Sequence, residues 1–65
     1  MTQEYVASTI LRRREVERLT GLARSTIYQY VKVGVFPPPV RLGARAVGWR
    51  YTEVLDWINS REASR

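Results

Sequence analysis

Two short amphipathic segments joined through a glycine constrain the fold of this chain more than any other feature. In the first segment, Arg13–Thr20, the apolar residues Val16 and Leu19 lie three positions apart, as residues on one helix face do. Gly21 follows, and a glycine there can adopt the left-handed conformation that ends a helix, so that Leu22 folds back onto the core. We therefore predict a helix that ends in a tight turn.

A second helix is predicted over about Arg24–Val33. It places Ile27, Tyr30 and Val31 at positions i, i+3 and i+4, so that one stripe packs inward and the remaining side chains face outward. Two helices joined by a tight glycine turn are typical of a helix-turn-helix.

The second half of the chain changes from helical to alternating spacing. Gly34 can stop the second helix, and the prolines at positions 37–39 hold the next residues extended and without amide donors. Apolar and basic residues then alternate in residues 40–42 and again in residues 49–51, and the segment GARAVG at 43–48 connects these two stretches. We predict a two-stranded hairpin whose arginines face outward while its apolar residues face the core.

A last helix is expected after the hairpin. Thr52 can cap it, and Glu53 and Asp56 lie near the positive end of the helix dipole. Its inward stripe consists of Val54, Trp57 and Ile58, with Leu55 beside it. The predicted fold class is small α+β and mainly helical: a winged helix-turn-helix with a two-stranded β-hairpin wing and a C-terminal helix.

A chain of 65 residues suffices for one domain with a small core. We place the winged helix-turn-helix domain at residues 10–60. Residues 1–9 are expected to form a flexible arm, in which Tyr5 and Val6 can add to an edge strand, and residues 61–65 a flexible tail.

Several kinds of chemistry are excluded by residues that the sequence lacks. It has no cysteine and no histidine, which removes disulfides, thiolate metal sites, the commonest zinc ligand and the commonest general base. The six carboxylates are scattered, with no pair that suggests an acid/base dyad or a metal cage. The segment GARAVGWR is not a phosphate loop, because Trp49 and Arg50 stand where lysine and serine or threonine are required. We expect no enzyme, no metal and no cofactor.

The sequence is basic and lacks a membrane-spanning stretch. No apolar run approaches the roughly 18 residues of a membrane span, and the N-terminus has no signal-peptide pattern. Eleven basic and six acidic residues give a net charge of +5, which favours a polyanionic partner. Alternatively, surplus arginine keeps a protein soluble, and basic small domains also bind membranes or proteins. We expect a soluble, cytoplasmic protein without a membrane partner.

The outer face of the second helix carries side chains suited to double-stranded DNA. An α-helix fits the major groove, and a hairpin tip can reach the backbone or the adjacent minor groove. Ser25, Thr26 and Gln29 can bond base edges and phosphates. Tyr28 can bond a phosphate or pack on a thymine methyl.

Cationic side chains are expected to contact the DNA backbone around this helix. Arg24 and Lys32 bracket the helix, and Arg45 at the hairpin tip can enter a narrow minor groove or contact a phosphate. The remaining expected contacts are Arg41 and Arg50, along the backbone, and the run Arg12–Arg14. The alternative for each is an ordinary solvated position.

A resemblance to the AlpA family of small phage and prophage regulators covers Glu15 to Ile58, EVERLTGLARSTIYQYVKVGVFPPPVRLGARAVGWRYTEVLDWI. The motifs TGL, RSTIY, FPPPV, RLG and RAVGW occur in this order, and a tryptophan-bearing helix follows. The family belongs with MerR-like winged helices and includes excisionase-like proteins. The resemblance implies that the helix holding Arg24 to Lys32 enters the major groove and that the loop around Arg45 is the wing.

Two positions depart from the family pattern. Ala23 stands where such proteins often have a capping serine, so the second helix is expected to start less firmly by about 1 kcal/mol. Gln29 replaces a position that is often basic, which bears on the base preference.

The outer face of the second helix and the basic wing motivate the leading hypothesis, and the resemblance agrees with it. The hypothesis is a sequence-specific double-stranded DNA-binding protein that regulates transcription of phage, prophage or mobile-element genes and is associated with the bacterial nucleoid when bound. One alternative is an excisionase, a recombination directionality factor that bends attachment-site DNA with an integrase as partner. Another is a protein-binding inhibitor without a DNA role. MerR regulators dimerise through a long helix after the DNA-binding domain, whereas this sequence ends at Arg65. We therefore expect a monomer in solution or cooperative assembly on DNA.

Overall fold

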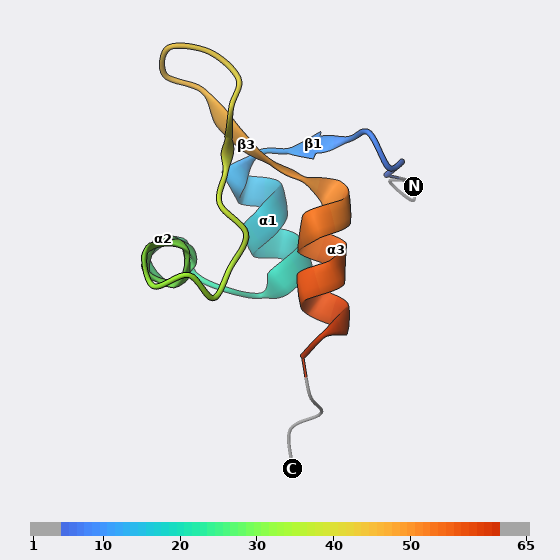
Figure 1. Cartoon of the computed structure of the whole chain (residues 1–65), viewed down its shortest axis with the longest axis vertical. Helices are drawn as coiled ribbons and strands as arrows, with labels where there is room; N and C mark the ends of the chain where they lie inside the picture. The colour runs from blue at the N-terminus through green and yellow to red at the C-terminus, as the bar shows by residue number, and fades with distance from the viewer. Residues whose placement is uncertain (1–4, 62–65) are drawn as a thin grey trace.

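Three helices and three short strands make up residues 5–61, the part of the chain that the computed structural model describes (Figure 1). In chain order they are β1 (Ile10–Leu11), α1 (Arg13–Thr20), α2 (Arg24–Lys32), β2 (Val40–Arg41), β3 (Val47–Arg50) and α3 (Tyr51–Asn59). The predicted fold class is confirmed. The predicted arm and tail fall partly on residues 1–4 and 62–65, which lie outside the described residues.

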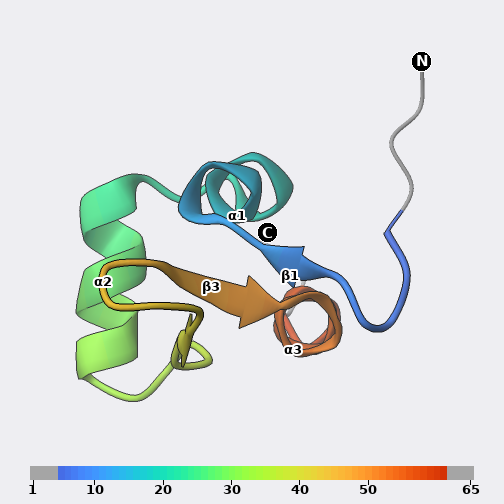
Figure 2. The same ribbon diagram turned by 90° about the horizontal axis from the view of Figure 1, so that it is seen from above.

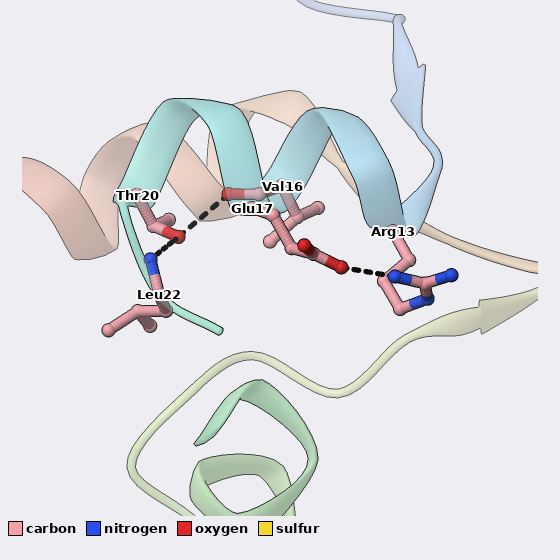
Figure 3. Close-up of polar contacts among 5 residues, drawn as sticks. All are labelled: Arg13, Val16, Glu17, Thr20 and Leu22. Carbon is pink, nitrogen blue, oxygen red and sulfur yellow. Dashed lines mark hydrogen bonds and ion pairs between the residues drawn. The ribbon is translucent and has the colours of Figure 1, made fainter. Parts of the chain in front are cut away.

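The turn between α1 and α2 has the predicted left-handed glycine. Gly21 has φ 76°, and its N–H donates to the carbonyl of Glu17 at 2.8 Å. The hydroxyl of Thr20 donates to the carbonyl of Val16 at 2.7 Å and accepts from the N–H of Leu22 at 3.2 Å (Figure 3). This one side chain therefore closes the end of α1 and directs the chain back towards the core.

The strands form an antiparallel sheet in the order β1-β3-β2. The hairpin of β2 and β3 is the predicted wing, and β1 is an additional strand, with Leu11 opposite Trp49. β1 has only two residues and lies in a segment without sustained alternation, so no pattern in the sequence predicts it. The suggested strand at Tyr5 and Val6 is absent from the described sheet. Val6 instead begins a turn, in which its carbonyl oxygen accepts a hydrogen bond from the N–H of Thr9 at 2.9 Å.

A small core joins every layer of the fold. Its buried members are Leu11, Val16, Ile27, Phe36, Trp49 and Val54. Each of the three helices contributes one of them, and β3 contributes the indole at the centre. Packing around β3 is so close that a Cβ on Gly48 would lie 2.5 Å from Cγ2 of Ile10 and 2.9 Å from the carbonyl oxygen of Leu11. Only glycine fits at position 48, where β1 pairs with β3.

Two indoles hold the segment that connects α2 to β2. The indole N–H of Trp49 donates to the carbonyl of Pro37 at 2.9 Å, and that of Trp57 donates to the carbonyl of Val35 at 2.6 Å. Phe36 packs edge-on against Trp57, with ring centroids 4.9 Å apart. Both tryptophans therefore combine an apolar ring in the packing with a satisfied polar edge.

The predictions for Thr52 and Leu42 are wrong. Thr52 was expected to cap α3, but α3 begins one residue earlier, at Tyr51, directly after β3. The N–H of Tyr51 donates a hydrogen bond to the carbonyl of Thr9 at 3.0 Å, and the helix has no side-chain cap.

Leu42 was expected in the core, but it is 45% exposed. It lies beyond β2, where the wing loop begins, and its N–H donates a hydrogen bond to the carbonyl of Ala46 at 2.7 Å.

Part of the predicted arm lies against the folded body. Tyr5 stacks at a tilt on Tyr51, with centroids 5.1 Å apart, and donates a hydrogen bond to Glu15. That hydrogen bond, together with burial, raises the pKa of Tyr5 above its ordinary value of 10.0. Because the folded state favours the protonated phenol, this contribution to stability is present below pH 10 and is lost as the pH rises through the raised pKa.

Candidate nucleic-acid interface

A stripe of exposed polar side chains runs along α2, the second helix of the helix-turn-helix. Ser25, Gln29 and Lys32 lie at positions i, i+4 and i+7, share one face and are all exposed. The opposite face holds Ile27, which is fully buried. The predicted inward and outward faces of α2 are thus confirmed, and α2 contains no acidic residue.

The other predicted contact residues of α2 flank this stripe. Thr26 is half-buried on one flank. Tyr28 lies on the other flank, 40% exposed, with its ring centroid 6.3 Å from that of Trp49. Arg24 is the exposed first residue of α2, and Ala23 before it makes no side-chain cap bond.

The wing brings Arg45 to the same side of the molecule as α2. Its loop closes through the carbonyl of Ala46, which accepts from the N–H groups of Leu42 and Gly43 at 2.7 and 3.2 Å. Arg45 is exposed at this loop. Figures 1 and 2 both place the hairpin tip and α2 on one side of the molecule and α3 on the other. Helix and wing can therefore face one ligand together.

The two strand arginines, Arg41 and Arg50, lie on opposite faces of the sheet. Arg41 lies opposite Val47 in the β2–β3 ladder, and Arg50 lies opposite Ile10 in the β1–β3 ladder. Cross-strand partners share a face, and residues 47 and 50 point to opposite faces because faces alternate along a strand. Arg41 is thus on the same face as Val47, whereas Arg50, the last residue of β3 before α3, is on the other face.

A basic cleft lies where the start of α1, α2 and the wing meet. It has a volume of about 300 Å³, and its lining residues are Arg12, Arg13, Arg14, Tyr28, Arg45 and Val47. The sequence alone shows the arginine run but not its neighbours. The pairing of β1 with β3 carries residues 12–14 to the wing, so only the sheet register reveals this grouping.

The cations of this surface are largely unneutralised. Between residues 5 and 61 the ion pairs are Arg13 with Glu17 and Arg18 with Glu15, the latter at 2.7 Å. Both pairs lie within α1, and Figure 3 shows the first. No carboxylate of this part of the chain lies within 4.0 Å of the cationic groups of Arg24, Lys32 or Arg45. The interface therefore presents a positive potential to solvent.

Metal and membrane sites are not apparent in the same part of the chain. Residues 5–61 contain no group of three or more side chains that could hold a metal ion. Their helices are all too short or too polar to cross a membrane.

Comparison with known proteins identifies the family. Residues 9–62 match the family described as prophage CP4-57 regulatory protein (AlpA). The chain belongs to the AlpA family. This membership confirms the resemblance seen in the sequence.

Two relatives resemble this chain over most of its length. Uncharacterized protein ORF88 of enterobacteria phage P4 is 49% identical over 55 residues, which cover 85% of this chain and 62% of that protein. The chain thus spans less than two thirds of the length of ORF88. The DNA-binding transcriptional activator AlpA of Escherichia coli K12 is 36% identical over 61 residues, which cover 85% of this chain and 87% of the activator. The family description and this activator name regulatory proteins and not enzymes.

Proposed function

We propose that this protein binds double-stranded DNA sequence-specifically and regulates transcription of phage, prophage or mobile-element genes. The observation that carries the proposal is the acid-free polar stripe on α2 beside a wing that presents Arg45. A relative that is a DNA-binding transcriptional activator supports the same function.

In this proposal α2 lies in the major groove. Ser25 and Gln29 meet base edges, where glutamine can make a bidentate pair with adenine. Thr26 and Tyr28, on the flanks of the stripe, lie nearer to the groove walls and meet phosphates. Arg24 and Lys32 contact phosphates from the two ends of the helix.

The wing is proposed to hold the DNA backbone or the adjacent minor groove. Arg45 supplies the main contact, because a guanidinium suits both a phosphate and a narrow minor groove. Arg41 adds to the backbone contacts on the face that it shares with Val47. Arg50 points from the other face and would contact DNA only if the duplex bends around the sheet.

Fluorescence anisotropy across a series of salt concentrations tests DNA binding. A random-sequence duplex should bind with a steep salt dependence, whose slope corresponds to roughly four to eight phosphates. No binding at low salt would contradict the proposal. A duplex selected from a random pool should then bind at least about 10³-fold more tightly than the random duplex, as specific sites do.

Paired substitutions test the assigned contacts. The double variant Q29A/R45A removes one amide and one guanidinium from the interface and should weaken binding to the selected duplex by about 100-fold, at roughly 1–3 kcal/mol for each specific contact. The variant N59A/R61A removes the same two groups from the end of α3 and should bind normally. Equal affinities of the two variants would show that the contacts are misassigned.

A second candidate function is the excisionase. The phage and prophage relatives support it, since a directionality factor would fill tandem sites, bend attachment-site DNA and contact an integrase. Excision in vitro with purified integrase is the discriminating assay, and absence of stimulation would count against this role. Mass measurements with and without DNA would show whether a monomer assembles cooperatively on adjacent repeats.

A protein-binding inhibitor remains the alternative without DNA. It would use the same basic surface to block an acidic partner. A partner that stays bound after nuclease treatment of the lysate would support this role, and loss of every partner would remove it.

A further inference from the structure

The basic cleft joins three parts of the chain that are separate in sequence. Arg12 precedes α1, Tyr28 belongs to α2, and Arg45 and Val47 belong to the wing. The pairing of Leu11 with Trp49 brings the residues that follow β1 to the wing. The grouping is therefore a product of the tertiary fold and not of a local run of charge.

The cleft concentrates positive charge without an internal counter-charge. Four of its six lining residues are arginines, and none is acidic. Arg13 is paired with Glu17, but Arg12, Arg14 and Arg45 have no carboxylate within 4.0 Å in residues 5–61. Like charges around one cleft repel each other, and an anion between them removes that cost.

The donors that line the cleft match the chemistry of a phosphate. Guanidinium groups make paired hydrogen bonds to phosphate oxygens, and the phenol of Tyr28 can donate one more. Tyr28 also places the cleft next to the stripe of Ser25 and Gln29, because it lies on the flank of the same helix. A strand of DNA whose groove receives this stripe would pass the mouth of the cleft.

We propose that this cleft clamps a phosphodiester group of the DNA backbone between Arg12 and Arg14 on one wall and Arg45 on the other, with the hydroxyl of Tyr28 as a further donor. The inference rests on the proposed DNA binding and adds to it the arginines that precede and begin α1. The clamp holds the backbone at a fixed place between α1 and the wing, and it thereby sets the register of α2 in the groove.

The salt dependence of DNA binding tests the clamp. The variant R12A/R14A should lower the slope of log affinity against log salt by about one, the contribution of one phosphate, and weaken binding at low salt by about tenfold. The control R18A/R61A removes the same charge outside the cleft and should leave the slope within about 0.3 of the wild type. Thermal unfolding of both variants checks that they are folded.

The outcomes separate the clamp from the proposed function. If the wild type does not bind DNA at low salt, both fail. If the wild type binds but R12A/R14A and R18A/R61A have the same slope, only the clamp fails.

Neutral backbone substitution locates the phosphate. A duplex selected by the wild type is scanned with single methylphosphonates, each of which removes one phosphate charge. One position should weaken the wild type about tenfold and leave R12A/R14A unaffected, because the lost contact is already absent. If every position affects both proteins equally, the arginines do not act on a particular phosphate and the clamp is overturned.

The hydroxyl of Tyr28 has its own test. Y28F should weaken binding by about tenfold, the loss of one hydrogen bond to a charged group, while Y30F on the inner face of α2 should not. Equal affinities of Y28F and the wild type would remove the hydroxyl from the clamp.

Discussion

The two helices of the helix-turn-helix have nearly equal length, but the charged side chains of α1 include ion pairs whereas those of α2 are all cationic. Both carboxylates of α1 are paired with arginines of the same helix, at i,i+4 and i,i+3 spacing. In contrast, α2 contains no carboxylate, and its cations at both ends are exposed. Each helix is attached to the core by one fully buried residue, Val16 in α1 and Ile27 in α2.

Both helices depend on packing against the core, but only α1 is also stabilised by ion pairs between its own side chains. Ion pairs of the kind in α1 stabilise a helix by about 0.2–0.5 kcal/mol each. At the start of α2, Arg24 opposes the helix dipole, and Ala23 supplies no cap bond. These features cost the isolated helix stability, but they leave its outer face cationic, as binding to DNA requires.

The largest expected effect concerns the core attachment of α2. The substitution I27A should lower the free energy of unfolding by about 2–5 kcal/mol, a large part of the 5–15 kcal/mol of a typical domain. V16A in α1 removes less buried volume and should cost less. Urea denaturation measures both variants, and a near-neutral I27A would show that α2 does not depend on its surroundings.

Charge reversal should separate folding from binding. R24E places a negative charge at the start of α2, which should stabilise the fold by about 0.3–1 kcal/mol, yet it should weaken DNA binding by at least about tenfold because it repels phosphate. R18E in α1 should instead destabilise the fold, since it breaks the pair with Glu15. If R24E and R18E change the free energy of unfolding in the same direction, the proposed difference between the two helices is wrong.

A capping side chain at position 23 should stabilise the start of α2. A23S supplies the missing hydroxyl acceptor and should raise the free energy of unfolding by about 1 kcal/mol. A44S, the same change in the exposed wing loop, should leave stability unchanged. Thermal unfolding distinguishes them, and equal melting temperatures would mean that the start of α2 does not limit stability.

The smallest effect is expected from the partner of Arg13. E17Q should cost about 0.2–0.5 kcal/mol of stability. It also leaves Arg13 unpaired in the basic cleft, so DNA binding should become slightly tighter and more salt-dependent. Anisotropy at several salt concentrations measures this, and weaker binding would contradict the idea that pairing restrains this arginine.

The helices were predictable because their signals are local. Glycines at positions 21 and 34 both have positive φ, and apolar spacing of three and four marked the inward faces. The hairpin was recognisable for the same reason, from alternation and a glycine-containing loop. Local signals failed at Thr52, because a contact with distant Thr9 determines where α3 begins.

Some predicted contact residues could be placed from local spacing, whereas the position of others depends on how the strands pair. Those of α2 follow from helical spacing, and all of them are exposed except Thr26, which is half-buried. The separation of Arg41 from Arg50 follows from strand register, and the grouping of Arg12 with Arg45 follows from the pairing of β1 with β3. Neither can be obtained from spacing, because both depend on which residues meet across the sheet.

The indole bonds to Val35 and Pro37 fix the chain between α2 and β2 during folding. The three prolines at positions 37–39 restrict the same segment further. The loss of conformational entropy in this connection therefore occurs on folding, before any ligand binds, so α2 and the wing would meet the proposed DNA as a preorganised unit. If this connection lacked these bonds, the protein would lose that entropy at every binding event and would bind more weakly.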